Sequence, residues 1–340
     1  MDTPTLTYSE FSGTPFQIGF ASGQYGANAF HTTVYESEIW AQLCEHKSSD
    51  TLSALQAATQ QHFPYIWDEL QGLAKGLEAP FEEVFLWNCK GELLADIPYY
   101  SATLAQIADA GPRITQSINA DTRLAKHCAL AVVKPDLEPA FATLIVPGNL
   151  AGNYAGVSEH GLVIAINPIA MNQPETGVPS AVLGRALFSQ TDLSKAIKLL
   201  NQTPRAGACH FVLSQQGSKT ALSIEFNGAE FIANPIQSPL VHTNHLMDVS
   251  KGAAGQSVAD KAQSTRRLQH LQAFADSMDL SDPLSILAKA ENEELEAVPT
   301  ATRQFFATVD MHVTANEVVW DVYDHPTTAA RFRMTNAEHL

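Results

Sequence analysis

The chain has 340 residues, 45% of them hydrophobic, and its 36 acidic and 20 basic side chains give a formal net charge of −16. This composition supports a large buried core and excludes a disordered chain. The negative charge would repel nucleic acid and anionic membrane surfaces, so we expect neither as a partner. Without a secretory leader pattern at the N-terminus or a run of 18 apolar residues, the chain is expected to be soluble and cytoplasmic.

Residues from about 15 to 80 show a helical pattern. In the stretch FPYIWDELQGLAKGLEAP, apolar residues recur at spacings of four, three and four, which places them on one helix face. These residues are Ile66, Leu70, Leu73 and Leu77. Pro80 is expected to end this helix.

Residues 111–170 show short apolar runs separated by Gly, Pro, Asn and Asp, as in the hairpins of an antiparallel sheet. The expected strands are RITQSINA, CALAVVKP, FATLIVPG and GLVIAINPI. Before them stands the stretch IPYYSATLAQIADAG (97–111), in which a step of small residues, Ser101-Ala102-Thr103, marks the junction of the helical and strand-rich parts.

Helical patterns return in the second half of the chain. They occur in SAVLGRALFSQ, in TDLSKAIKLLNQ with Thr191 or Asp192 as its cap, and in DKAQSTRRLQHLQAFADSM, where Leu268, Leu271, Phe274 and Met278 share one side. Further strands are expected in HFVLSQQG, ALSIEFNG, AEFIANP, QFFATVDM and EVVWDVYD. Runs of strands separated by runs of helices predict an α+β architecture with stacked antiparallel sheets.

Six stretches, in this order along nearly the whole chain, resemble the acyl-coenzyme A:6-aminopenicillanic acid acyltransferase family, a branch of the N-terminal-nucleophile (Ntn) hydrolases. They are GTPFQIGFASG, DELQGLAKGLEAPFEEVFLWNCKGEL, SINAD, NYAGVSEHGLVIAINPI, GVPSAVLGRAL and VHTNHLMD. The resemblance implies a single four-layer αββα domain over 1–340. It also implies a precursor that cuts itself into a mainly helical α chain (1–101) and a β chain (102–340) that carries the catalytic core.

In this family the cut precedes a nucleophile, usually the cysteine of a Gly-Cys-Thr step. The freed residue then has both a nucleophile and an α-amine, which can act as its base. Here the corresponding residues read Ala102-Thr103, and an alanine methyl cannot attack a carbonyl.

Three interpretations remain for the nucleophile. The favoured one takes position 102 as the nucleophile position, with its cysteine replaced, for instance by engineering to trap an inactive, uncut precursor, because only this leaves a threonine directly behind the nucleophile. In the second, Ser101 is a natural nucleophile. In the third, Thr103 serves.

The resemblance also assigns roles to other polar residues. Asp121, in the Asn-x-Asp step that begins at Asn119, would orient the new amine and assist cleavage. Asn244 would donate to the oxyanion. Arg303 would bind a carboxylate or steady Asp121.

Several residues are expected near the substrate: Asn119, Tyr154, Asn153, His245 and Tyr100. His242 and His245 form an HxxH pair without a third ligand motif, so we predict no metal site. The cysteines Cys44, Cys89, Cys128 and Cys209 form no CxxC pair and are expected to be reduced and structural.

The sequence therefore predicts an Ntn-type amidase or acyltransferase that takes its acyl group from a small amide or thioester. No cofactor is expected, although coenzyme A could be a substrate, and the expected partners are the two fragments of the precursor and possibly further copies of the chain. Two other classes remain open: a non-catalytic binding protein on the same fold, and a metal-dependent hydrolase built on His210, His242 and His245.

Overall fold

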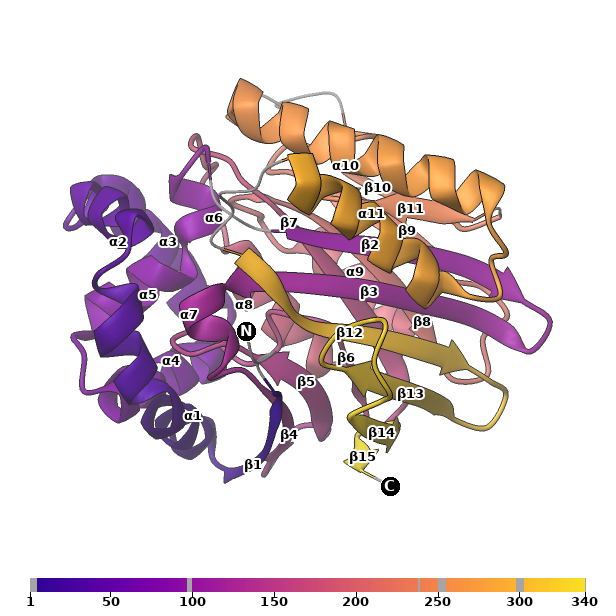
Figure 1. Cartoon of the computed structure of the whole chain (residues 1–340). Helices are drawn as coiled ribbons and strands as arrows, with labels where there is room; N and C mark the ends of the chain where they lie inside the picture. The colour runs from indigo at the N-terminus through magenta and orange to yellow at the C-terminus, as the bar shows by residue number, and fades with distance from the viewer. Residues whose placement is uncertain (1–4, 97–99, 238, 250–254, 298–302, 340) are drawn as a thin grey trace.

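Two stacked β-sheets form the centre of the computed structural model, which describes residues 5–96, 100–237, 239–249, 255–297 and 303–339, with only the backbone for 294–297 and 303–305 (Figure 1). One sheet has eight strands in the order β1-β4-β5-β6-β7-β8-β9-β10, and the other has seven in the order β11-β2-β3-β12-β13-β14-β15. Helices flank both sheets, so the fold is a four-layer αββα sandwich and the predicted α+β class is confirmed.

The strands pair antiparallel except for β1 and β4, which are parallel. The eight-stranded sheet consists of β1 (Thr7–Gly13), β4 (Ala129–Pro135), β5 (Phe141–Ile145), β6 (Gly156–Ser158), β7 (Leu162–Ile169), β8 (Ala208–Gln215), β9 (Leu222–Phe226) and β10 (Phe231–Pro235). The seven-stranded sheet consists of β11 (Leu240–His242), β2 (Tyr100–Ala108), β3 (Gly111–Asp121), β12 (Arg303–Val313), β13 (Val318–Tyr323), β14 (Phe332–Thr335) and β15 (Glu338–His339).

Apart from one single-turn helix, the helices fall into three groups. Before β2 come α1 (Pro15–Ala29), α2 (Glu38–Leu43), α3 (Asp50–His62), α4 (Pro64–Leu77), α5 (Phe81–Asn88) and α6 (Lys90–Leu93), with short helical turns η1 (Phe30–Val34) and η2 (Cys44–His46). Helices α8 (Ser180–Phe188) and α9 (Leu193–Gln202) pack on β7 and β8, whereas α10 (Val258–Ser277) and α11 (Pro283–Ala297) cover β11, β2 and β3 (Figure 1). The one-turn α7 (Thr122–Ala125) follows β3.

Several sequence predictions are confirmed at the level of single residues. Helix α4 buries the predicted apolar face and ends at Glu78, which adopts a left-handed conformation before Pro80. Asp192 caps α9 by accepting the backbone N–H of Lys195. Helix α10 points Leu271 toward a buried apolar cluster beneath the helix layer, and the other predicted apolar residues, Leu268, Phe274 and Met278, pack against the same cluster.

Several elements were not predicted, among them the strands β1, β6, β14 and β15 and the helix α11. Strand β1 has mixed burial and is rich in Thr, Ser and Glu, so its sequence lacks the apolar alternation that marks a half-buried strand. Helix α11 begins at Pro283, and its sequence lies in a region of the chain that the sequence analysis left unassigned.

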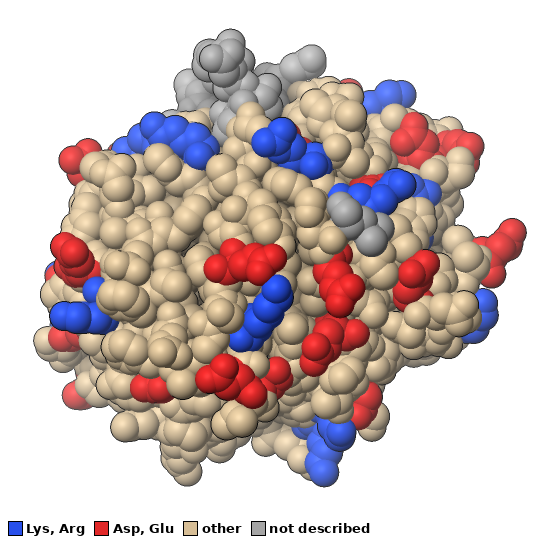
Figure 2. All heavy atoms as spheres, turned by 90° about the horizontal axis from the view of Figure 1, so that it is seen from below, with Lys and Arg blue, Asp and Glu red and all other residues tan. Residues whose placement is uncertain are grey.

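Acidic side chains prevail on the face of the molecule turned away from α10. Figure 2 views this face from below, and acidic side chains outnumber basic ones there, in keeping with the net charge of −16.

Within the described ranges, none of the helices combines the length and apolarity needed to cross a bilayer.

Helices α1 and α4 approach each other closely because each presents glycines at the contact, Gly19 and Gly23 on α1 and Gly72 and Gly76 on α4. A Cβ atom added to Gly72 would lie 2.0 Å from the carbonyl oxygen of Phe16. Because backbone cannot move aside as a side chain can, these glycines set the spacing of the two helices.

We predict that Gly72→Ala lowers the free energy of unfolding by about 3 kcal/mol, because the new methyl group forces α1 and α4 apart. Urea unfolding followed by circular dichroism measures the change. Lys75→Ala, at an exposed position of the same helix, is the matched control and should change stability by less than about 0.5 kcal/mol. Equal effects of the two variants would contradict this account of the helix contact.

Candidate active site

Strand β2 places Ser101 and Thr103 on one face of the seven-stranded sheet and Ala102 and Leu104 on the other, because side chains alternate along a strand. Ser101 and Thr103 are buried and point toward β7 of the opposite sheet, where both contact Asn167. Leu104 belongs to the apolar cluster under α10 and α11, and Ala102 packs against that cluster. A polar centre therefore lies between the sheets, and an apolar contact lies behind it.

The Ser101 hydroxyl is the point on which two amides converge. Asn167 Nδ2 donates to Ser101 Oγ at 2.8 Å, and Asn244 Nδ2 donates to the same oxygen at 3.1 Å. Both asparagines are buried. Two N–H donors on one hydroxyl oxygen stabilise negative charge on that oxygen or on an oxygen that takes its place.

Asn244 is held by groups from three elements. Its Oδ1 accepts the backbone N–H of Ser101 at 3.0 Å and Arg267 Nη2 of α10 at 2.9 Å. Its Nδ2 also donates to the carbonyl oxygen of Pro168 at 2.9 Å. The acceptors and donors around the amide therefore fix which end faces Ser101 Oγ.

Arg267 brings a buried positive charge to this centre. Besides its bond to Asn244, its guanidinium lies 4.4 Å from the ring centroid of Tyr100 and its Nη1 lies 3.5 Å from the Ser101 carbonyl oxygen. A cation over an aromatic face in a buried position is favourable. The charge lies close enough to stabilise an anion that forms at Ser101.

Two histidines stack behind Asn167. The rings of His210 and His242 lie 3.6 Å apart, centroid to centroid, at an interplanar angle of 9°. Burial first, and then the neighbouring His242, lower the pKa of His210 well below its usual range. His210 is therefore neutral.

The Glu225 carboxylate anchors the other ring and the loop after β11. It accepts His242 Nε2 at 3.3 Å and the backbone N–H groups of Met247, Asp248 and Val249 at 2.6 to 2.8 Å. Burial acts to raise the pKa of Glu225, but these hydrogen bonds outweigh it and the pKa is lowered. Glu225 thereby fixes the loop that carries Asn244.

His245, expected near the substrate, lies in the same loop and contacts Ser264 Oγ of α10 at 2.8 Å. Burial, followed by the positive charges nearby, lowers the pKa of His245 to about 4. It is therefore a neutral ring that ties the loop to α10.

Three predicted residues lie on the helix side of the seven-stranded sheet. Ala102 packs toward α10 and α11. The Tyr100 hydroxyl donates to Gln263 of α10, and Asn119 Nδ2 donates to Glu291 of α11. Of these side chains, Tyr100 reaches the centre through its ring contact with Arg267.

Asp121 caps α7 at the end of β3. Its carboxylate accepts the backbone N–H of Arg123 at 2.8 Å and two guanidinium bonds from the same residue at 3.0 and 3.1 Å. Ile118 is the β3 partner of Ser101, so Asp121 lies three residues farther along the strand, about 10 Å away. Arg303 stands opposite Asp121 in β12, and its side chain lies outside the described residues.

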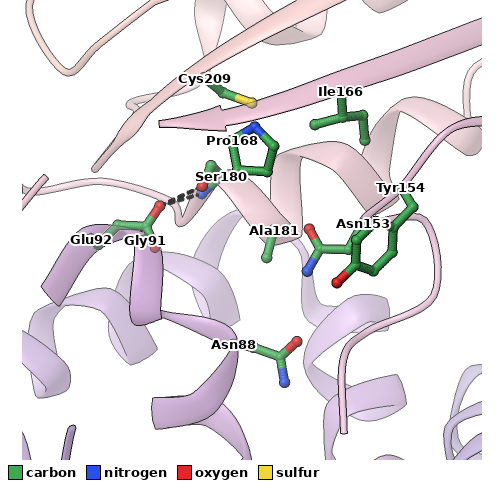
Figure 3. A pocket seen from close by; sticks show the side chains of 10 residues that line it. All are labelled: Asn88, Gly91, Glu92, Asn153, Tyr154, Ile166, Pro168, Ser180, Ala181 and Cys209. Carbon is green, nitrogen blue, oxygen red and sulfur yellow. Dashed lines mark hydrogen bonds between the residues drawn. The ribbon is translucent and has the colours of Figure 1, made fainter. Parts of the chain in front are cut away.

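Asn153 and Tyr154 line a pocket on the other face of β7 (Figure 3). Because Asn167 points toward Ser101, its neighbours Ile166 and Pro168 point the other way, into this pocket. The cavity measures about 20 Å³, room for a single water molecule. Pro168 connects it to the polar centre, since its carbonyl oxygen binds Asn244.

Glu92 forms one wall of the same pocket. Its Oε1 accepts the backbone N–H and the hydroxyl of Ser180 at the start of α8 (Figure 3). Burial raises the pKa of Glu92. The residue thus joins α6 to α8 beside the polar centre.

Metal ligands do not gather in the described part of the chain, where no group of three or more His, Cys, Asp and Glu side chains could hold an ion. Cys89, Cys128 and Cys209 are buried and Cys44 is partly buried, all as free thiols. Burial raises the pKa of each of the three buried thiols, which keeps them protonated.

Two residues of this centre were missed by the sequence analysis. Asn167 is the single amide in the apolar run LVIAINPI, and a lone polar residue in a buried strand is the signal that identifies it. Arg267 lies on the apolar side of a helix, one turn before Leu271, where a charged residue also breaks the pattern.

Comparisons with known proteins bear on the family of this chain. A family model described as acyl-coenzyme A:6-aminopenicillanic acid acyl-transferase matches residues 114–311. The β-alanyl-dopamine/carcinine hydrolase of Drosophila melanogaster is 25% identical over 258 residues, which cover 66% of this chain and 61% of that protein. The chain thus spans about three fifths of the length of this relative.

We predict that Arg267→Ala lowers the free energy of unfolding by about 2 kcal/mol, because it removes a buried hydrogen bond to Asn244 and the contact with Tyr100. Arg123→Ala, which breaks a half-exposed ion pair with Asp121, is the control and should cost less than about 1 kcal/mol. Urea unfolding of both variants checks the difference. A cost for Arg267→Ala no larger than for Arg123→Ala would refute the buried role of this arginine.

Proposed function

Because the chain belongs to the acyl-coenzyme A:6-aminopenicillanic acid acyl-transferase family, we propose that it is a self-processing amide hydrolase whose nucleophile is Ser101. The observation that carries the proposal is the convergence of Asn167 and Asn244 on Ser101 Oγ. The hydrolase activity of the Drosophila relative favours transfer of the acyl group to water. Transfer to an amine would use the same acyl-enzyme.

The orientation of β2 favours Ser101 over position 102. A cysteine at position 102 would point into the apolar cluster of Leu104 and Val241 beneath α10 and α11. It would lie on the opposite face of the strand from Asn167. Thr103 is on the correct face, but its hydroxyl proton is donated to Asn167 Oδ1 while Gln116 donates to its oxygen. In these contacts Ser101 Oγ accepts N–H groups and donates no proton.

Self-cleavage would occur between Tyr100 and Ser101. Ser101 Oγ attacks the Tyr100 carbonyl carbon, the C–N bond breaks, and the chain is joined through an ester. Water then hydrolyses this ester, which leaves a carboxylate on Tyr100 and an α-amine on Ser101. Tyr100 is fixed by Gln263 and Arg267, so the carbonyl under attack is held in place.

In the processed enzyme the α-amine of Ser101 would act as general base. Its unperturbed pKa of about 7.7 to 8.0 leaves a useful neutral fraction at physiological pH. The amine accepts the Oγ proton, Oγ attacks the substrate carbonyl, and the leaving amine takes the proton. The amides of Asn167 and Asn244, with Arg267 behind, would stabilise the tetrahedral oxyanion.

The relative suggests the first substrates to assay. That relative is named as a hydrolase of β-alanyl-dopamine and carcinine. We propose small amides of this kind as the substrate class, with β-alanyl-dopamine and carcinine as the opening compounds. The assay follows release of the amine.

We predict that the purified chain, 36.8 kDa in mass, yields fragments of about 11 and about 26 kDa and that the larger one begins at Ser101. Ser101→Ala should remain intact and lose amidase activity by at least about a thousandfold, because both cleavage and catalysis need Oγ. N-terminal sequencing and amine release measure the two effects.

Ala102→Cys and Thr103→Val are the matched variants. Both should still be cut before residue 101, because neither removes Ser101 Oγ. If the wild-type chain stays intact and Ala102→Cys yields a larger fragment that begins at residue 102, the nucleophile position is 102 and not 101. A wild-type chain and an Ala102→Cys chain that are both intact and inert would support a binding protein. Stoichiometric transition metal in an active chain would support a metal-dependent hydrolase.

A further inference from the structure

We infer that His210 is a positioning residue that holds the Asn167 amide with its Nδ2 toward Ser101 Oγ. The inference rests on the proposed function, since it assumes that Ser101 is the nucleophile. His210 lies in β8 directly opposite Asn167 in β7, and both side chains are fully buried. The distance from His210 Nδ1 to Asn167 Oδ1 is 3.0 Å.

The direction of this hydrogen bond follows from the chemistry of its two ends. An amide oxygen only accepts, so His210 Nδ1 carries the proton and donates it. A ring with its proton at Nδ1 has a free lone pair at Nε2. Ser223 Oγ lies 3.0 Å from Nε2 and can donate its hydroxyl proton there. The ring thus has one neutral form that satisfies both neighbours.

Thr103 gives Asn167 Oδ1 a second donor. Gln116 Nε2 donates to Thr103 Oγ1 at 2.8 Å, which leaves the hydroxyl proton of Thr103 for Asn167 Oδ1 at 2.9 Å. With two donors on the oxygen, the NH2 group of Asn167 has to face the other way. That direction leads to Ser101 Oγ.

The stack with His242 keeps the ring of His210 in its plane. His242 is in turn bound to the carbonyl oxygen of Thr243 and to Glu225. His210 therefore cannot rotate its Nδ1 away from Asn167 without breaking the stack and the bond to Ser223. The ring acts as a rigid spacer between β8 and the amide.

Loss of the Nδ1 donor would remove one of the two interactions that set the amide orientation. An Asn167 amide that flips would present Oδ1 to Ser101 Oγ, and the hydroxyl would lose one of its two N–H donors. Because an N–H donor on the nucleophile oxygen favours its anion, loss of one donor slows reaction at Ser101 Oγ.

The test compares two substitutions of His210. Phe keeps a flat buried ring and removes the donor, whereas Asn can place its NH2 near the position of Nδ1. The readout is the rate at which a fluorophosphonate probe modifies Ser101, located by peptide mass spectrometry. We expect His210→Phe to slow modification at least about tenfold and His210→Asn to stay within about threefold of wild type.

Ser214→Ala is the matched control. Ser214 lies on the same strand, is fully buried and donates to the carbonyl oxygen of Thr220, outside this network. In the Ser214→Ala variant, the probe should modify Ser101 at the wild-type rate, even though the variant loses a buried hydrogen bond. Thermal unfolding of each variant confirms that the chain is folded. If the probe modifies Ser101 in His210→Phe as fast as in the wild type, the inference about His210 is wrong. The proposal that Ser101 is the nucleophile would still stand.

A second measurement separates this inference from the proposed function. Two-bond ¹H–¹⁵N correlation spectra of the histidine-labelled protein report which nitrogen of His210 carries the proton. We expect the Nδ1–H form. A proton at Nε2 would overturn the inference whatever happens at Ser101. If the probe does not modify Ser101 in the wild type and His210 carries its proton at Nδ1, the proposal that Ser101 is the nucleophile is wrong. The role of His210 in orienting the Asn167 amide would still stand.

Discussion

The alternation of side chains along β2 is the constraint on which the site depends. Because β2 is hydrogen-bonded on both edges, to β11 and to β3, it cannot slip by one residue without reversing every side chain. Leu104 and the apolar cluster beneath α10 and α11 hold one face, so Ser101 and Thr103 have to face the opposite sheet. The burial of an ordinary apolar cluster thus determines which small residue enters the polar centre.

The amides of that centre are hydrogen-bonded at both their oxygen and their nitrogen, which makes their burial favourable. A buried amide without partners is costly, and Asn167 and Asn244 each have partners for both oxygen and nitrogen. The partners come from strands and a helix far apart in the sequence, so the complete fold is needed to set either amide. Once set, both amides point at Ser101 Oγ without the need to reorganise during a reaction, which is the arrangement that stabilises a transition state.

Much of the architecture could be predicted from the sequence because apolar periodicity is a local property. The apolar faces of α4 and α10 and most strands follow from it. The site was harder to predict. Asp121 and Arg303 do stand opposite each other, but Asp121 is occupied by its near neighbour Arg123, a local pairing that no motif reveals. The choice between Ser101 and position 102 depends on which face of β2 meets the helices, and this is a tertiary property.

The electrostatics of the centre agree with chemistry that builds up negative charge. His210 is neutral, and its stacked neighbour His242 lies 3.3 Å from the Glu225 carboxylate. Arg267, on the other side of Asn244, contributes a full positive charge next to Ser101. Two amide donors and one nearby guanidinium each favour the anion of the Ser101 hydroxyl and so oppose the cost of burying that charge. The same groups would favour an oxyanion on a carbonyl carbon bound to that oxygen, so one arrangement would serve both the proposed cut in the chain and the proposed cut in a substrate.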